Sequence, residues 1–378
     1  MSSYNYTILH IWGIPIRINI SLLVFLPILA FLIGSGEQIG AYSSLITALT
    51  PATVDPAALS GPEDRWLIGG VSAVALFGSV TFHELGHAWA AMRYDIEVES
   101  ITLWLLGGLA SLSSMPEEWN REFWIAIAGP ASSLLLAAGG LAALVVVPSS
   151  ATLLVYCLGF LAVMNVLLAG FNMLPAFPMD GGRVLRALLA RNRSYVSATR
   201  TAASVGTLFA LLFLGLGILT FSPLLLILAL FIYVAASNES RSVVIAGLLS
   251  DLTVADLISE QEPLPADSTV EAALDRLFAS RRSELPVVDD DGDIVGVVTT
   301  ENLRSVPTDQ FATTPVGSVA TTELARLDGR MDAVDGLYEL AGNDAGVALV
   351  EWDGRPIGLI SRGDFTSALN MRRDVEPF

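Results

Sequence analysis

The sequence contains no lysine, so all 20 of its basic residues are arginine, against 38 aspartate and glutamate residues. Weakly hydrated arginine together with a carboxylate-rich surface suits a protein that stays soluble at high salt. Biased codon usage is the alternative explanation. The net charge of −18 argues against a nucleic-acid partner, because an acidic surface repels phosphates.

Cysteine and histidine are also scarce. The single Cys157 cannot form an internal disulfide, and its apolar neighbours indicate a small core residue. Only three histidines occur, and two of them fall four residues apart in the run His83-Glu84-Leu85-Gly86-His87. This run therefore stands out as a candidate site.

Charged residues make up only 15% of a chain that is 53% hydrophobic, which excludes one ordinary soluble domain. They are also unevenly spread. Residues 1–247 carry ten arginines and thirteen acidic residues, whereas residues 248–378 carry ten and twenty-five. The sequence therefore predicts a membrane domain at 1–247, followed by a separate water-soluble part.

The membrane part contains six apolar segments near the ~20 residues that a spanning helix needs. They are 14–34, 66–92, 123–147, 151–171, 200–220 and 222–246. Six spans place both termini on one side, together with every arginine of this part except Arg65. The positive-inside rule makes that side cytoplasmic. We therefore expect a multi-pass protein of the cell membrane, embedded in the lipid bilayer, with both termini and the soluble part cytoplasmic.

One apolar stretch, residues 101–113, is too short to span a membrane. Its glycine pair, Gly107 and Gly108, indicates a turn between two short strands. The prediction is a re-entrant β hairpin whose open edge is covered by protein or offered to a partner, because lipid cannot satisfy a strand edge. The alternative is an interfacial loop lying on the helix bundle.

The histidine pair lies inside the second predicted span. On a helix, the four-residue spacing places His83 and His87 on one face with Glu84 beside them, an arrangement that presents a zinc ion together with a general base. The alternative is a pair of satisfied core histidines. Polar groups at membrane depth are costly and therefore functional by default, which favours the metal interpretation.

A third ligand is expected in the segment from Asn172 to Gly182, where two prolines and two glycines end the fourth span. This leaves Asp180 on irregular backbone, where apolar surroundings disfavour its charge unless a cation is near. Pairing with Arg183 or Arg186 is the alternative. Three protein ligands are typical of catalytic zinc, which keeps a fourth position for water and lowers the pKa of that water towards ~7.

These two motifs resemble those of the site-2 proteases, intramembrane zinc metalloproteases that cut transmembrane segments of other proteins. The resemblance covers the six-span region. It implies one zinc ion held by His83, His87 and Asp180, with Glu84 as the catalytic base. It also implies that Asn172 helps to hold the substrate and that Gly107 and Gly108 lie on an edge for an unwound substrate. Many relatives have asparagine where this chain has Ser133, so Ser133 is left out of the predicted site.

A hydrolase with a transmembrane protein substrate is thus the predicted function, in the manner of regulated intramembrane proteolysis. A helical peptide bond is inaccessible, so the substrate must be extended, and strand addition to an open edge would hold it so. The alternative is a membrane metal transporter or metal sensor without proteolysis. Transport favours ligands along a path through several spans, and few polar residues lie deep in spans one, five and six.

Residues 248–378 contain an internal repeat of helix, strand, Asp/Gly turn and strand, which divides them into 248–307 and 308–378. The pattern resembles a tandem pair of cystathionine-beta-synthase (CBS) domains, α/β modules that in many relatives bind adenine nucleotides. The candidate nucleotide-binding residues are Thr299, Asn302, Ser361 and Asp364. A module that forms a homodimer, gates substrate entry or keeps the protein soluble without a nucleotide is the alternative, because the acidic surface repels phosphates.

Overall fold

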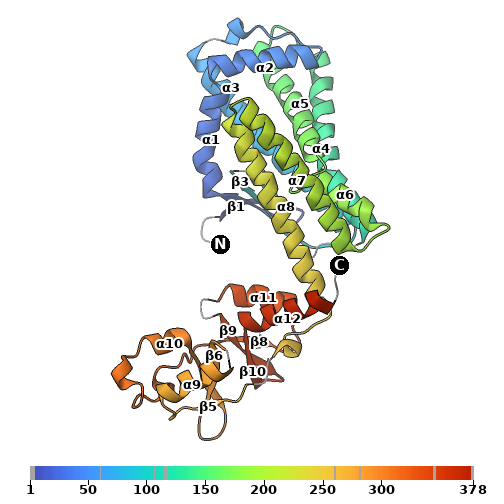
Figure 1. Ribbon diagram of the computed structural model, residues 1–378. Helices are drawn as coiled ribbons and strands as arrows, with labels where there is room; N and C mark the ends of the chain where they lie inside the picture. The colour runs from blue at the N-terminus through green and yellow to red at the C-terminus, as the bar shows by residue number, and fades with distance from the viewer. Residues whose placement is uncertain are drawn as a thin grey trace. The chain divides into compact units, whose positions relative to one another are not determined.

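The computed structural model describes residues 5–59, 61–105, 107–113, 118–258, 261–280, 282–343 and 346–375. The chain divides into two compact units, residues 1–240 and 241–378. The first is mainly helical and the second contains two small sheets (Figure 1). The predicted fold class, a multi-span helical membrane protein with a soluble α/β part, is confirmed.

Five long apolar helices, counted within the described residues, are able to cross a membrane. They are α3 (Pro62–Met92), α4 (Trp119–Val146), α5 (Thr152–Asn172), α7 (Tyr195–Leu219) and α8 (Pro223–Leu249). A sixth span is formed if the shorter helices α1 (Ile20–Ile33) and α2 (Gly36–Leu49) act together, although they meet at a bend of 74°. Figure 1 shows α2 lying across one end of this unit.

The first predicted span, 14–34, begins too early. Residues Ile14–Asn19 form strand β2, and α1 starts only at Ile20, where the side chain of Asn19 accepts a hydrogen bond from the Ser21 amide. This cap ends the strand and begins the helix. Arg17 is the single charged residue in 14–34, so the hydropathy averaged over a span of this length does not show the boundary.

The predicted hairpin forms and belongs to a larger sheet. Strands β1 (Asn5–Ile11), β2, β3 (Val98–Trp104) and β4 (Gly107–Leu112) lie in that order, with β2 parallel to β3. The glycine pair was wrongly placed in the turn. Gly107 and Gly108 begin β4 and pair with Trp104 and Leu103, while Leu106 lies outside the described residues. In the described chain, β4 is an edge strand of this sheet.

Close helix packing brings α3 against its neighbours at the level of the histidines. A Cβ atom on Gly86 would lie 2.6 Å from the carbonyl oxygen of Ala128, so α3 and α4 approach as only glycine allows. One turn above His83, the buried Asn165 of α5 donates a hydrogen bond of 2.9 Å to Ser79 of α3. Contacts with α4 and α5 thus fix the position of α3, and with it that of the histidine pair.

The short helix α6 (Asp180–Ala190) follows the Pro-rich segment. Cβ atoms on Gly181 and Gly182 would overlap main-chain atoms of Met173, Leu174 and Ala176. The glycines therefore let α6 begin tightly against the end of α5.

The second unit contains two three-stranded sheets of similar topology. The first comprises β5 (Leu264–Pro265), β6 (Glu284–Val288) and β7 (Ile294–Thr299), and the second β8 (Ala325–Asp328), β9 (Val347–Trp352) and β10 (Arg355–Ser361). The helices of this unit are α9 (Val270–Ser280), α10 (Thr300–Arg304), α11 (Ala333–Ala341) and α12 (Arg362–Val375). Short 3₁₀ helices lie at Ala255–Leu257, Thr308–Gln310 and Val316–Ser318. A further 3₁₀ helix, Pro56–Leu59, belongs to the first unit. Both predicted hairpins are present.

Candidate active site

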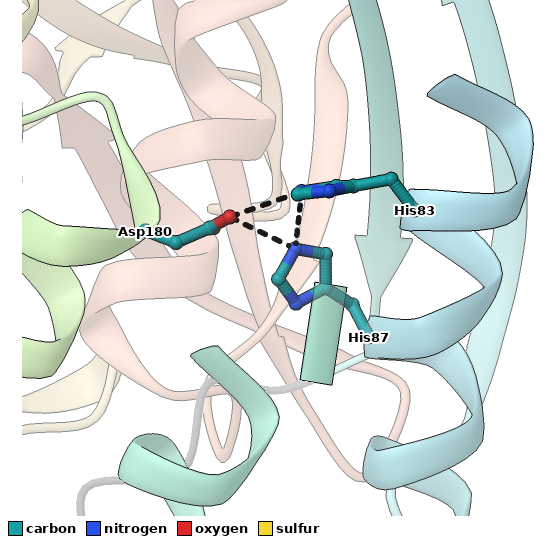
Figure 2. Close-up of side chains that lie close together, drawn as sticks. All are labelled: His83, His87 and Asp180. Carbon is teal, nitrogen blue, oxygen red and sulfur yellow. Dashed lines mark hydrogen bonds and ion pairs between the residues drawn. The ribbon is translucent and has the colours of Figure 1, made fainter. Parts of the chain in front are cut away.

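Three buried side chains from distant parts of the chain converge in the helical unit. His83 and His87 come from α3, and Asp180 from the first turn of α6 (Figure 2). Oδ2 of Asp180 lies 3.1 Å from Nε2 of His83 and 3.2 Å from Nε2 of His87, and the two Nε2 atoms are 3.2 Å apart. The three predicted ligand residues are therefore brought together.

The other ring nitrogens are held by α4. Nδ1 of His87 lies 2.7 Å from the carbonyl oxygen of Ile125, and Nδ1 of His83 lies 2.9 Å from Oγ of the fully buried Ser133. A carbonyl can only accept, so Nδ1 of His87 carries a proton. In a neutral ring, Nε2 of His87 then presents a lone pair to a carboxylate and a second imidazole. Such a grouping of acceptors calls for a cation between them.

A zinc ion fits this space. The ligand atoms of a tetrahedral zinc centre with ~2.1 Å bonds lie about 3.4 Å apart, close to the separations found here. Gly129 of α4 faces the same point, because a Cβ atom there would overlap Nε2 of His87 and lie 2.7 Å from Nε2 of His83. The missing side chain leaves room where the ligand atoms meet.

Asp180 does not lie on irregular backbone, as the sequence had suggested. It is the first residue of α6, with Met179 as the N-cap, and it is 8% exposed. The alternative partner Arg186 points elsewhere and forms ion pairs with Glu122 and Glu239. The carboxylate therefore faces the histidines and not an arginine at its own helix start.

The candidate base, Glu84, lies beside the sheet. A Cβ atom on Gly108 would lie 2.5 Å from Cγ of Glu84 and 3.0 Å from its Oε1. The side chain of Glu84 is thus in contact with the beginning of the edge strand β4, next to the metal-ligand candidate His83 on the same helix. Gly107, at φ +137°, starts this strand in a conformation that side chains rarely adopt.

The remaining predicted site residues form their hydrogen bonds with residues outside this cluster. Asn172 is half-buried and donates to the carbonyl oxygen of Leu168 in its own helix. In the second unit, Thr299 and Asn302 form a capping box at the start of α10. Ser361 donates to Asp364, and Arg282 pairs with the other carboxylate oxygen of Asp364 at 3.2 Å.

Sequence reasoning missed the two groups that orient the histidines. Ser133 was set aside because it replaces an asparagine, yet its hydroxyl contacts His83. The signal was its position four residues after Gly129, which places both on one face of α4. The carbonyl of Ile125 carries no signal in the sequence, because every residue has one.

Comparisons with known proteins agree with this geometry. The peptidase family M50 pattern matches residues 71–153 and 147–214, and the CBS domain pattern matches residues 251–309. A zinc metalloprotease of Methanocaldococcus jannaschii is 28% identical over 98% of this chain and 97% of its own. Rip3 of Mycobacterium tuberculosis, named as a zinc metalloprotease, is 35% identical over 82% of this chain and 83% of its own.

Among solved structures, a site-2 protease from Methanocaldococcus jannaschii is 31% identical and matches 63% of this chain and 96% of its own, with a TM-score of 0.42. The family is assigned by Rip3, whose 35% identity extends over most of both proteins. The chain therefore belongs to peptidase family M50, the site-2 proteases, and is a multi-pass membrane zinc metalloprotease.

Proposed function

We propose that this enzyme hydrolyses peptide bonds within transmembrane segments of membrane-tethered proteins. The observation that carries the proposal is the convergence of His83, His87 and Asp180 next to Gly129, while the neighbouring Glu84 contacts the edge strand β4. These groups lie on helices that are able to span a membrane or that pack directly against them. The reaction would thus take place at membrane depth.

His83, His87 and Asp180 would hold the zinc ion. When bound, zinc supplies Lewis acidity, which polarises a carbonyl and makes water acidic enough to lose a proton near neutral pH. Ser133 and the carbonyl of Ile125 keep both imidazoles turned so that Nε2 faces this point. Burial of all three ligands keeps competing water away from their metal-facing atoms.

Glu84 would be the general base. It follows His83 directly on α3, and its carboxylate is half-buried against Gly108. From this position Glu84 would take a proton from the attacking water and later deliver it to the leaving amine. The contact with Gly108 supports this role, because it brings the carboxylate next to the strand that would hold the scissile bond.

The edge strand β4 would bind the substrate in an extended form. In the described residues, β4 pairs only with β3, so its other edge is available for strand addition. Gly108 brings this edge close to Glu84, since a side chain at this position would keep it away. Asn172, which ends α5 just before the segment leading to Asp180, would contribute a polar contact to the same substrate.

A metal transporter is less well supported. Among the described residues, one group of three metal-capable side chains is found, and all three are buried. A transport path would need further ligands along several spans. A candidate general base beside the ligands is also unnecessary for transport but is required for hydrolysis.

The distribution of arginines supports one orientation of the enzyme in the membrane. Arg93 lies over the ring of Trp89 at 4.5 Å, and Arg191 lies over the ring of Trp119 at 5.3 Å. Tryptophan is enriched at membrane interfaces. Both pairs lie near the end of α3 and the start of α4, on the side that the positive-inside rule makes cytoplasmic. Both termini and the soluble unit would then be cytoplasmic.

The soluble unit would regulate or dimerise the enzyme as a CBS pair, with repeats at 248–307 and 308–378. An adenine nucleotide would contact Ser361 and Asp364 in one repeat and Thr299 and Asn302 in the other. Arg282 already pairs with Asp364, so a ribose would have to share that carboxylate. Calorimetric titration of the full-length enzyme with ATP, compared with Asp364→Asn, tests this site. A wild-type enzyme that binds no ATP would limit the pair to dimerisation or solubility.

Substitution of Glu84 tests the catalytic proposal. Glu84→Gln should retain one zinc per chain and lose roughly 10²- to 10⁴-fold in the rate of cutting a membrane-embedded helical substrate. The matched control is Glu99→Gln, an exposed glutamate on β3, which should cut at the wild-type rate. Cleavage at the wild-type rate by the Glu84 variant would contradict the role of this residue as general base. Zinc transport into proteoliposomes without cleavage would support the transporter instead.

A further inference from the structure

A charged cluster that the proposed mechanism does not use lies behind the metal-ligand candidates. Its centre is Arg186, which is fully buried. Its guanidinium forms ion pairs of 2.5 Å with Glu122 of α4 and of 2.5 Å with Glu239 of α8. The rings of Phe177 and Tyr195 lie 5.0 and 4.8 Å from its Cζ atom.

The guanidinium remains charged in this environment. Burial by itself lowers the pKa of Arg186, but the negative charges of Glu122 and Glu239 more than reverse this, so the pKa lies above its ordinary value. A buried charge of this kind must keep its partners, because leaving it unpaired is costly. Arg186 therefore ties three helices together as one unit.

Two of these helices contribute groups to the candidate metal site. Arg186 lies on α6, six residues after Asp180, which begins the same short helix. Glu122 lies on α4, three residues before Ile125, whose carbonyl orients His87. The Arg186–Glu122 pair thus joins the helix that carries the carboxylate ligand to the helix that orients an imidazole ligand.

The third helix leads out of the membrane unit. Glu239 lies on α8, which continues without interruption to Leu249. Leu249 is fully buried in the hydrophobic core of the second unit, together with Val254 and Phe365. The side chain of Glu239 is 29% exposed, whereas that of Glu122 is 6% exposed, so water can replace the first partner far more readily than the second.

We propose that Arg186 is a positioning residue that fixes the Asp180 helix against α4, and that its ion pair with Glu239 transmits a shift of α8 to the metal site. This inference rests on the proposed function, because it assigns Asp180 to the metal. Loss of the Glu239 pair leaves Arg186 neutralised by Glu122, so the fold is kept while the connection to α8 is cut. The soluble unit thereby acts on metal retention through one helix.

Zinc release from full-length enzyme in lipid nanodiscs tests the positioning role. We expect Glu239→Gln to release zinc to an excess of chelator about tenfold faster than wild type, as removal of a partner outside the ligand set does elsewhere. The visible spectrum of the cobalt-substituted variant should change, while the melting temperature of its metal-free form should not. The control is Arg241→Gln, an exposed charge two residues further along α8, which should behave as wild type.

A double-mutant cycle tests transmission. Leu249→Ala loosens α8 at its buried end and should speed zinc release in the wild-type background, yet add nothing in the Glu239→Gln background. Independent, multiplying effects of the two substitutions would refute transmission through this pair. Release from Glu239→Gln at the wild-type rate, or an equal effect of Arg241→Gln, would overturn the proposal. A wild-type enzyme that binds no zinc would instead refute the proposed function on which it rests.

Discussion

The main-chain carbonyl oxygen of Ile125 lies 2.7 Å from Nδ1 of His87, so a peptide group of α4 sets the tautomer of one candidate zinc ligand. Side-chain substitution cannot remove this acceptor. The corresponding group for His83 is a hydroxyl, that of Ser133, and this one can be removed. The two histidines are therefore orientated by chemically different groups on the same helix.

Removal of the Ser133 hydroxyl should weaken zinc binding. Ser133→Ala leaves Nδ1 of a buried histidine without its partner, and we expect the zinc affinity to fall by roughly 10- to 100-fold. Competition titration against a chromophoric chelator measures it. The neighbouring Ser132→Ala is the matched control, since the Ser132 hydroxyl donates to the carbonyls of Gly129 and Phe82 and not to a histidine. Equal affinities for Ser133→Ala and wild type would contradict this role.

A methyl group at position 129 should exclude the metal. Gly129→Ala places a Cβ atom where the two Nε2 atoms meet, so we expect less than one zinc per chain and no cleavage. Metal analysis of the purified protein measures the occupancy. Gly139→Ala on the same helix is the control, because a Cβ atom there meets nothing within 4 Å and should leave zinc content unchanged. Full occupancy in Gly129→Ala would mean that the metal lies elsewhere.

A methyl group at position 108 should separate metal binding from turnover. The three atoms nearest to a Cβ atom on Gly108 all belong to Glu84, so Gly108→Ala pushes against that side chain and zinc content should stay at the wild-type level. The expected loss is about tenfold or more in kcat, because the base is moved from its position. Gly78→Ala, at an open position on α3, should cut normally. An unchanged kcat in Gly108→Ala would show that the contact between β4 and Glu84 is not needed for the reaction.

The helical part of the fold could be predicted because long apolar segments have few alternatives in a membrane. The sheet could be predicted only in part. Residues 14–19 directly precede a strongly apolar helix, and their parallel pairing with β3 depends on contacts about 85 residues apart. The helix α2 was not predicted, because its polar residues and its bend with α1 hide it from a search for straight spans.

The candidate ligands could be predicted from the sequence, since the two histidines are spaced four residues apart within an apolar span and histidine is rare in this chain. What surrounds them could not. Asp180 begins a helix because Gly181 and Gly182 let α6 pack against the preceding segment. The use of Ser133 in place of an asparagine depends on where α4 lies relative to α3. The start of α6 and the position of α4 relative to α3 depend on how the helices pack, which cannot be read from the sequence.

The open edge of β4 has a consequence for which proteins such an enzyme would cut. A transmembrane helix satisfies its own backbone groups, and inside the hydrocarbon it has no water to replace them. Pairing with β4 would therefore compete with the helix for the same amides and carbonyls. Selection would then depend on how easily a segment gives up its helix, so glycine or proline near the cut would matter more than any one side chain.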